Sequence, residues 1–408
     1  MKKISAIFLL LIVFFAGAGV TVKHTAVAQT SAQSMIIINA ENNQVLFEKN
    51  AYQKLAMAST TKILTAITVL EYCRLNDIIK VDAKAVGIEG SSIYLQKDEE
   101  LTVQQILYGL MLQSGNDCAA ALAIHCAGSI EEFASLMNKV AKKAGASDSN
   151  FVTPHGLDHK DHYTTAYDLA IISAYAMKNE DFRNIVATKK IEIPWQGREY
   201  NRVIVNKNKI LNRYDGGNGI KTGFTKKAGR CLVSSAKRNE LELICVVLNC
   251  GPMFEDSMEY MDMVFKKYHI QIFISPYEYL GKLKLNNNEP VHIYAKQGFR
   301  YAAEVDDKNF TAILEIDKKT APLKKDEVIG KIKIYHFNDL IFCAVIYTMD
   351  SIEELSFHES LLLIFKSWTL RENHASAYTF FAKKICHSRH IFQMLIMLAR
   401  SARFNLRF

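Results

Sequence analysis

The chain has 408 residues and a formal net charge of +8, with 49% hydrophobic residues. This is the composition of a globular protein, and the length allows two or three domains. The positive charge is confined to the two ends, because removing the first 28 residues (+3) and the residues from Arg371 onward (+6) leaves about −1. A body without a basic field argues against a nucleic-acid partner.

The first 28 residues predict a signal peptide. A short basic start, MKK, precedes an apolar run at 4–22, and the tripeptide AVA at 26–28 fits the small-x-small pattern of a cleavage site. The apolar run is almost long enough to span a membrane, so a retained anchor is the alternative interpretation. In either case we expect the remainder of the chain to be exported.

A hairpin and a helix are expected next. The stretch SMIIINAENNQVLFEKN (34–50) reads as two short strands around an Asn-rich turn, and TTKILTAITVLEYC (60–73) has apolar residues at helical spacing. At the start of this helix, Ser59 and Lys62 stand three residues apart, which places both on one face. A serine oxygen beside a lysine amine is a candidate nucleophile with its base, provided that the lysine pKa is lowered.

This Ser-x-x-Lys pattern is weak evidence by itself. A solvated lysine at an ordinary helix start gives the same pattern. A second copy occurs at Ser234 and Lys237 inside a probable strand, and we interpret that copy as chance.

Several helical stretches follow at 102–146, interrupted by Ser114, Gly115 and Asn116. The structural interpretation is that Gly115 ends one helix and Asn116 caps the next. The functional interpretation places the Ser114 hydroxyl and the Asn116 amide on a tight turn that faces a cleft. No other Ser-x-Asn occurs in the chain.

A third motif lies near the end of the same unit. After a helix that starts at about residue 165, the strand-like runs GRCLVSSAK and LELICVVLNC are separated by a polar turn, and a helix is expected at 257–268. Lys221, Thr222 and Gly223 stand shortly before the first run, as the chain's single Lys-Thr-Gly. They form either the polar start of a strand or a strand edge where Gly223 admits a substrate backbone and Lys221 attracts a carboxylate.

Strands at both ends of this unit and helices in its middle predict an α+β fold with a mainly antiparallel sheet. From residue 273 the pattern changes to short alternating runs, which predict a small β-rich domain at 273–349. An amphipathic helix is expected at 350–370. A basic tail at 371–408 could hold anionic lipid, or it could be an extension without function.

The eight cysteines are scattered along the chain without a CxxC pair. Export permits disulfides, but Cys231 and Cys245 lie in strand-like apolar runs, where cysteine acts as a small hydrophobe. We expect mostly free thiols and no catalytic cysteine.

Together, the three motifs in this order resemble the signature of the penicillin-recognising serine enzymes. The stretches MASTTKILTAI, LMLQSGNDCAAALA, FVTPHGLDHKDHYTTAYDLA and GIKTGFTKKAGRCLVSSAKR are similar to low-molecular-mass penicillin-binding proteins that are D-alanyl-D-alanine carboxypeptidases. The resemblance is to the Gram-positive type, including sporulation-associated members, and it covers about residues 34–368. It implies a catalytic domain at 29–272 with the fold of this superfamily, including a helical insertion.

The resemblance assigns a role to each motif residue. Ser59 is implied as the nucleophile, Lys62 as its base, and Ser114 as the proton relay to the leaving amine. The implied substrate-binding residues are Asn116, Lys221, Thr222, Gly223 and Phe224. The backbone N–H groups of Ser59 and Phe224 would form an oxyanion hole, whose donors commonly contribute about 10²- to 10³-fold in rate.

Two features qualify this assignment. Strand alternation turns Thr222 away from the side that Lys221 uses. The residue after Lys-Thr-Gly is Phe224, where several family members carry histidine or tyrosine, so substrate preference could differ.

The resemblance also implies partners and a location. The substrate is a peptidoglycan stem peptide ending in D-Ala-D-Ala, β-lactams are inhibitors, and neither a metal nor an organic cofactor is needed. The helix at 350–370 would lie on the membrane surface, at the outer face of the cytoplasmic membrane. Packing of this helix against the β domain is the alternative.

Other functions compete with this one. The loop HGLDHKDHY (155–163) gathers residues that can bind zinc, although it lacks regular helical spacing. A β-lactamase would need a base for fast deacylation, and no glutamate occurs between Ser149 and Asp168. A D,D-endopeptidase uses the same machinery. A non-catalytic wall-binding or sensing protein would keep only the fold.

Overall fold

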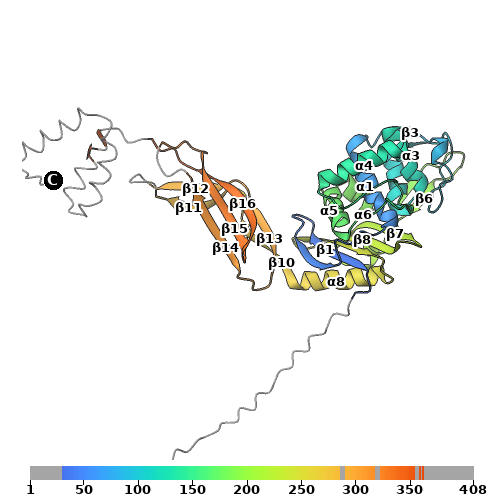
Figure 1. The fold of residues 1–408 in the computed structure, drawn as a ribbon. Coiled ribbons are helices and arrows are strands. Elements are labelled where there is room, and N and C mark those ends of the chain that lie inside the picture. The colour runs from blue at the N-terminus through green and yellow to red at the C-terminus, as the bar shows by residue number, and fades with distance from the viewer. Residues whose placement is uncertain (1–29, 285–289, 318–321, 354–357, 360, 363–408) are drawn as a thin grey trace, which may run out of the picture. The chain divides into compact units, whose positions relative to one another are not determined.

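The computed structural model describes residues 30–284, 290–317, 322–353, 358–359 and 361–362. The chain divides into two compact units, Met1–His269 and Ile270–Phe408 (Figure 1). The expected signal peptide and basic tail lie outside the described residues, as does most of the helix expected at 350–370. How functions are divided between the two units stays a prediction.

A five-stranded antiparallel sheet forms the centre of the first unit, in the order β2-β1-β9-β8-β7. Strands from both ends of the unit lie side by side, because β1 pairs with β9. The α+β class predicted from the sequence is therefore confirmed. The strands are β1(Ser34–Asn39), β2(Val45–Lys49), β7(Gly217–Thr225), β8(Gly229–Arg238) and β9(Leu241–Leu248).

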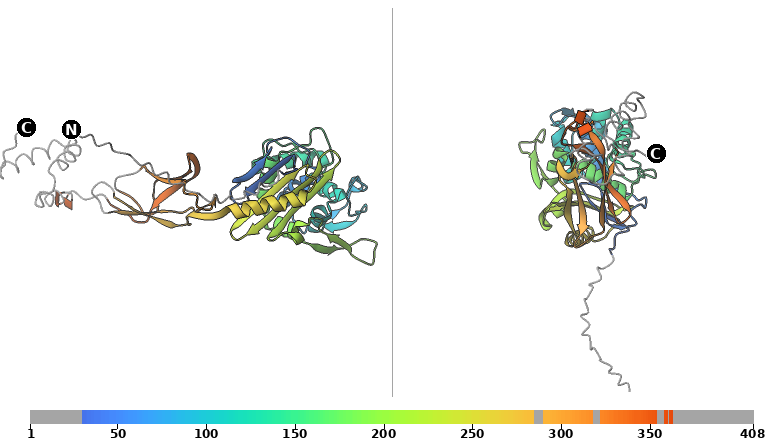
Figure 2. Two further views of the ribbon diagram at one scale, coloured as in Figure 1. Left: turned by 90° about the horizontal axis from the view of Figure 1, so that it is seen from below. Right: turned by 90° about the vertical axis from the view of Figure 1, so that its left-hand side faces the viewer.

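Helices cover both faces of this sheet. Figure 2 shows α8 lying along one face, where it contacts β8 and β9, while α5 contacts β1 and β9 on the other. Because both faces of the sheet are covered, β1 and β9 can be apolar along almost their whole length. The helices are α1(Lys62–Tyr72), α2(Val103–Tyr108), α3(Asn116–Ala127), α4(Ile130–Ala144), α5(Ala166–Met177), α6(Glu180–Ala187), α7(Ile210–Arg213) and α8(Met253–Lys267).

The central helix of the first unit is α1. It is packed against α3, α4 and α5, and each of its first eight residues is buried. A helix that is buried all round holds even its polar side chains in the core. Lys62, the first residue of α1, is consequently a buried lysine.

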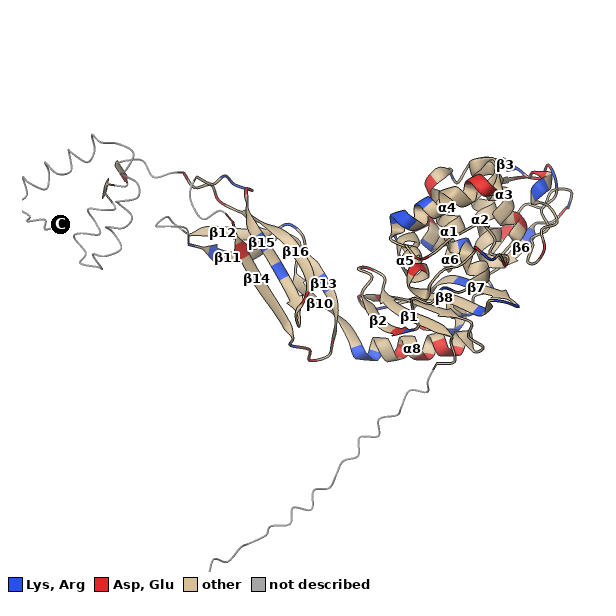
Figure 3. Cartoon of the chain, viewed as in Figure 1, with Lys and Arg blue, Asp and Glu red and all other residues tan. Residues whose placement is uncertain are grey.

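Helix ends follow rules that are visible in the sequence. Thr165 caps α5 by accepting a hydrogen bond from the Asp168 N–H, which confirms the helix expected from about residue 165. In α4 and α8 acidic residues occupy the first turn and basic residues the last, as the helix dipole favours (Figure 3). Helix α8 begins at Met253, earlier than the predicted 257, because its first turn carries few apolar residues.

Short elements connect these layers. Two small antiparallel pairs join β3(Ile78–Lys80) to β4(Glu100–Thr102) and β5(Lys190–Ile193) to β6(Arg202–Val205). The turns are 3₁₀ helices η1(Ala58–Thr61) and η2(Ala83–Ala85) and the π-helical turn η3(Gly109–Gln113).

Up to residue 353 the described part of the second unit is all β, as predicted for the segment after 273, and residues 358–359 and 361–362 are helical. Its larger sheet is antiparallel in the order β11-β12-β16-β15-β14, and β10 pairs with β13. Val291 and Ile293 of β12 lie in the core, which places His292 and Tyr294 on the opposite face. The strands are β10(Tyr268–Ile274), β11(Glu278–Leu283), β12(Val291–Ala295), β13(Phe299–Glu304), β14(Phe310–Ile316), β15(Val328–His336) and β16(Asp339–Thr348).

None of the helices in the described parts of the chain is long and apolar enough to cross a membrane.

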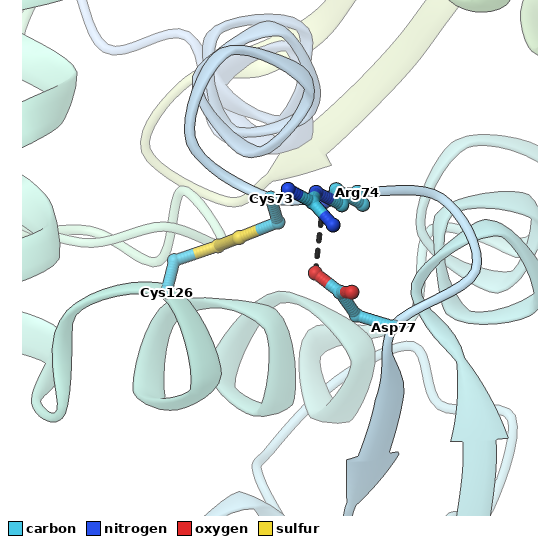
Figure 4. The surroundings of a disulfide bond; sticks show 4 residues. All are labelled: Cys73, Arg74, Asp77 and Cys126. Atoms are coloured by element: carbon cyan, nitrogen blue, oxygen red, sulfur yellow. Dashed lines mark hydrogen bonds between the residues drawn. A yellow bond between two sulfur atoms is a disulfide. The ribbon is translucent and has the colours of Figure 1, made fainter.

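A disulfide between Cys73 and Cys126 joins the C-terminal ends of α1 and α3 (Figure 4). Beyond Cys73 the chain turns, and the Arg74 backbone N–H donates to Asp77 Oδ2 at 2.9 Å. The scattered spacing of the cysteines did not predict this pairing. Five other cysteines in the described residues are free thiols: Cys118, Cys231, Cys245, Cys250 and Cys343.

Replacing both Cys73 and Cys126 by serine should lower the free energy of unfolding. The bond closes a separation of 53 residues, and disulfides typically stabilise by about 2–4 kcal/mol by constraining the unfolded chain. Urea unfolding of the oxidised protein measures the change. Cys343→Ser, which removes an exposed free thiol, is the matched control. Identical unfolding midpoints for the double variant and the control would contradict the bond.

Candidate active site

The side chain of Lys62 connects two of the three sequence motifs. Ser59 lies in η1, one turn before Lys62 at the start of α1. The Lys62 Nζ donates to Ser59 Oγ at 3.0 Å, to Asn116 Oδ1 at 2.6 Å and to the carbonyl of His155 at 2.6 Å. An ammonium has three donors, and all three are used here. Ser59 itself is only partly buried, so its hydroxyl is accessible.

The backbone around Ser59 is held in an unusual conformation. Ala58 has a φ of +50°, a region that costs a residue with a Cβ about 1–2 kcal/mol. Gly156 packs so closely that a Cβ there would lie 2.0 Å from the Ala58 carbonyl oxygen. Thr61 Oγ1 donates to the same oxygen at 2.8 Å. Strain next to a reactive side chain is a common feature of functional sites.

Burial lowers the pKa of two lysines in this region. The pKa of Lys62 lies well below the ordinary lysine value, first because of burial and then because of the charge of Lys221. Burial and the nearby Lys207 lower the pKa of Lys221 to about 7. A lysine with a depressed pKa can be neutral near physiological pH and can then accept a proton.

The second motif lies on a break between helices. The π-helical turn η3 ends at Ser114, which has a φ of +65°, Gly115 is the N-cap, and α3 begins at Asn116. The residue in the left-handed conformation is therefore Ser114. We expected Gly115 to end the helix instead. Gly115 is needed for a different reason, because a Cβ there would lie 2.7 Å from Cys118 Sγ.

The amide of Asn116 is engaged on both sides. Its Oδ1 accepts from Lys62, and its Nδ2 donates to the carbonyl oxygen of Glu89. Ser114, two residues earlier, is buried with 6% exposure. The amide therefore orients the amine of Lys62.

The third motif lies on β7, the edge strand of the central sheet in the described residues. A Cβ at Gly223 would lie 3.0 Å from the backbone nitrogen of Ser59, so only glycine permits this approach. Lys221 is buried on the same side, and its Nζ donates to the Thr222 carbonyl at 3.0 Å. Thr222 is half-buried and Phe224 is 64% exposed, as alternation along the strand predicts.

Two residues of the site were not predicted. The first is Lys207, after β6, whose Nζ donates to the Gln113 carbonyl at 2.9 Å and whose charge lowers the pKa of Lys62 and Lys221. Its backbone N–H also donates to Leu112. In the sequence it is a lysine in a polar loop, and no local pattern distinguishes it from a surface lysine.

The second is Asp117, which is 1% exposed. Its carboxylate accepts hydrogen bonds from Ser92 Oγ at 2.6 Å and from the backbone N–H groups of Ile93 and Leu95. It therefore fixes the segment beside Asn116. An acidic residue in the first turn of a helix is ordinarily explained by the helix dipole alone, so no pattern in the sequence singles it out.

The histidine-rich loop makes contacts of other kinds. The pKa of His155 falls to about 4 and that of His162 to about 3, mainly through burial, so both are neutral at pH 7. His162 Nε2 contacts Thr61 Oγ1 at 2.9 Å, and Asp158 accepts from Thr225. Across the described ranges, no group of three His, Cys, Asp or Glu side chains is placed to hold a metal ion.

The second Ser-x-x-Lys copy lies in β8, as expected. Ser234 is fully buried in the central sheet, whereas Lys237 is exposed near the end of the strand. Residues three apart in a strand point to opposite faces. This copy brings no lysine amine to its serine.

A serine beside a buried lysine, with Gly223 of an edge strand packed against the backbone of that serine, defines a serine acyl-transfer site. Residues 21–251 match the D-alanyl-D-alanine carboxypeptidase family, peptidase family S11. The chain belongs to this family and is a serine-type peptidase.

Individual relatives agree with this assignment. The D-alanyl-D-alanine carboxypeptidase DacF of Bacillus subtilis (strain 168) is 28% identical over 365 residues, which are 85% of this chain and 92% of DacF. DacB2 of Mycobacterium tuberculosis is 31% identical over 254 residues, 62% of this chain and 86% of DacB2. Both are named for the same activity.

The fold has solved counterparts. Penicillin-binding protein 5 from Haemophilus influenzae superposes with a TM-score of 0.67 at 26% identity, covering 80% of this chain and 98% of that one. The Streptomyces K15 DD-transpeptidase superposes with a TM-score of 0.55 at 30% identity, covering 58% and 98%. The fold predicted from the sequence, with its additional β domain, is that of penicillin-binding protein 5.

The two lysines should give a bell-shaped dependence of kcat/KM on pH. With Lys62 as the expected base, which must be neutral to accept a proton, activity should be lost as the pH falls through its lowered pKa. With Lys221 as the expected carboxylate-binding residue, which must be charged, activity should be lost as the pH rises above about 7. Lys207→Gln removes a charge that lowers both pKa values, so both limbs should move to higher pH.

The rate of acylation by penicillin across pH measures the rising limb directly. Lys209→Gln is the matched control, because Lys209 lies two residues away and is equally exposed. It is not among the charges that lower either pKa. Profiles that are identical for the wild type and Lys207→Gln would contradict the electrostatic role of Lys207.

Proposed function

We propose that the protein removes the terminal D-alanine from peptidoglycan stem pentapeptides through an acyl-enzyme on Ser59. The observation that carries this proposal is the 3.0 Å hydrogen bond between Ser59 Oγ and the buried amine of Lys62, whose pKa is well below the ordinary value. Membership of the D-alanyl-D-alanine carboxypeptidase family supports the choice of substrate.

In the acylation step, neutral Lys62 takes the proton of the Ser59 hydroxyl as its oxygen attacks the carbonyl carbon of the penultimate D-alanine. The negative charge on the carbonyl oxygen is stabilised by the backbone N–H groups of Ser59 and Phe224. Gly223 supports this role by allowing β7 to lie beside Ser59. When the C–N bond breaks, a proton passes through Ser114 to the nitrogen of the leaving D-alanine.

In the deacylation step, water attacks the ester carbonyl, and the proton that it releases returns to the Ser59 oxygen. The products are the shortened stem peptide and the free serine. Until the terminal D-alanine leaves in the acylation step, Lys221 and Thr222 hold its carboxylate. Asn116 binds the peptide backbone, and the substrate thereby replaces the Glu89 carbonyl that its Nδ2 contacts in the free protein.

The same chemistry explains inhibition by β-lactams. Ser59 would open the β-lactam ring and retain the product as an ester. Because no glutamate occurs between Ser149 and Asp168 to activate water, we propose that this ester is hydrolysed slowly and that penicillin inhibits the enzyme.

Ser59→Ala should reduce D-alanine release from a soluble pentapeptide by at least about 10⁴-fold, because the nucleophile is lost. Covalent labelling by fluorescent penicillin should disappear as well. Release is measured with a coupled assay for free D-alanine.

The chain supplies a matched control in Ser234→Ala, which alters the serine of the second Ser-x-x-Lys copy. Its hydroxyl makes one 3.5 Å contact with the Cys245 carbonyl and reaches no lysine. This variant should retain activity and labelling. Equal release by wild type and Ser59→Ala would overturn the mechanism, and loss of activity with a chelator would favour a metallopeptidase.

We propose further that the enzyme works outside the cytoplasmic membrane, at its outer face. The supporting observations are the signal-like first 28 residues and the amphipathic pattern at 350–370. Most of these residues lie outside those that the structure describes, so the proposal depends on the sequence.

Truncation separates the two candidate anchoring segments. A chain ending at Leu370 should remain in the membrane fraction, because it keeps the amphipathic segment. A chain ending at Met349 should become soluble. If removal of residues 371–408 alone releases the protein, the basic tail is the anchor instead.

A further inference from the structure

Three tyrosines stand opposite one another across the larger sheet of the second unit. Tyr279 of β11 is in register with Tyr294 of β12, and Tyr294 is in register with Tyr347 of β16. The three strands are neighbours in Figure 1. Ile293 and Ile346, next to them in the sequence, lie in the core, so the tyrosines occupy the opposite face.

We call four tyrosines of this face the tyrosine platform: Tyr277, Tyr294 and Tyr347, whose rings are in contact, and Tyr279, which is in register with Tyr294 on the neighbouring strand. The centroids of Tyr294 and Tyr347 are 5.7 Å apart, and Tyr277 stacks on Tyr294 at 6.5 Å with an angle of 19° between the rings. Tyr294 is only 8% exposed, whereas Tyr277 is 71% and Tyr279 49% exposed. The inner ring supports outer rings that face solvent.

Polar partners fix the inner rings in place. The Tyr294 hydroxyl donates to Asp326 Oδ1 at 2.7 Å. The Nζ of Lys296 lies 4.1 Å from the centroid of the Tyr347 ring, a cation–π contact. A surface whose side chains are already ordered loses little conformational entropy when it binds a ligand.

A hydrogen-bonding rim borders the platform. His292 Nδ1 lies 2.7 Å from Asp350 Oδ2, and their side chains are 39% and 44% exposed. The ring of Tyr279 is 5.8 Å from that of His292. Flat apolar rings bordered by a few polar groups are typical of a small-ligand site.

We propose that the tyrosine platform binds the glycan strands of the cell wall. A pyranose ring has a face of C–H groups that matches the negative face of an aromatic ring, and hydroxyls at its edge that can bond to the rim. The platform spans two strand spacings, about 10 Å, which is close to the length of a disaccharide. Exposed apolar patches on soluble proteins commonly mark binding sites.

A membrane surface is the rival partner, because tyrosines also gather at lipid interfaces. Two observations favour a glycan. The first is composition: the platform contains four tyrosines, and the aliphatic residue that extends it is Val328 of β15, which is in register with Tyr347. The second is charge: the carboxylates of Asp326 and Asp350 border it beside the cations Lys296 and Lys325, so these four groups provide no net positive charge to attract an anionic lipid surface.

The choice of glycan rests on the proposed function, since the stem peptides of peptidoglycan are attached to such strands. Weak binding of the glycan by one unit would raise the effective concentration of stem peptides for the other. This effect should be seen with polymeric substrate and not with a free pentapeptide.

The test uses the full chain with Tyr277→Ala and Tyr279→Ala combined, and two probes: insoluble glycan strands stripped of stem peptides, and soluble chitotetraose. Loss of two exposed rings should weaken binding to both probes about tenfold or more. Phe337→Ala is the control, because Phe337 is 63% exposed in the turn between β15 and β16. It should bind as the wild type does, and the Tyr→Phe pair, which keeps the rings, should also bind.

The outcomes are separable. Undiminished glycan binding by the alanine pair, or no binding by the wild type, would overturn the proposal. If the alanine pair loses binding to phosphatidylglycerol vesicles but keeps glycan binding, the proposal is also overturned. The platform is then identified as a membrane-binding surface. All variants should release D-alanine from a free pentapeptide at the wild-type rate. Failure of that release in the wild type, with glycan binding intact, would reject the proposed function alone.

Discussion

The burial of the Lys62 amine is the constraint on which the rest of the catalytic unit depends. A buried charge is expensive unless its donors are satisfied or the group becomes neutral. Here the charged amine has acceptors for all three donors in Ser59, Asn116 and the His155 carbonyl, and its lowered pKa lets it lose one proton, after which its lone pair can accept from Ser59. These acceptors come from η1, α3 and a distant loop, so the amine fixes three segments of the chain relative to one another.

The site is also an unneutralised cluster of positive charge. Within the described residues, no carboxylate forms an ion pair with Lys62, Lys207 or Lys221, and the nearby Asp117 is occupied by hydroxyl and backbone donors. Such a site discourages the protonation of its own base. The substrate carboxylate that we propose for Lys221 should relieve this repulsion and so link recognition of the terminal residue to the protonation of Lys62.

The sequence predicted the features that depend on residue type and spacing. The α+β class, the β-rich second unit and the meeting of Ser59, Lys62 and Asn116 follow from periodicity and from three short motifs. Lys207, Asp117 and the disulfide did not, because each acquires its meaning from a partner far along the chain. Ser114 was missed for another reason, because a serine is a poor prediction for a left-handed residue.

The π-helical turn η3 has a consequence for how this family can vary. Such a turn places one residue more in the helix than regular α-helical winding allows, and it ends where the Ser114 turn begins. Deleting one residue between Gly109 and Gln113 would restore regular α-helical winding, so the segments on either side would keep their relative orientation although the wide turn was lost. Inserting one residue would instead turn everything after it by about 100° relative to Lys62. Deletions should therefore be tolerated in this turn more readily than insertions.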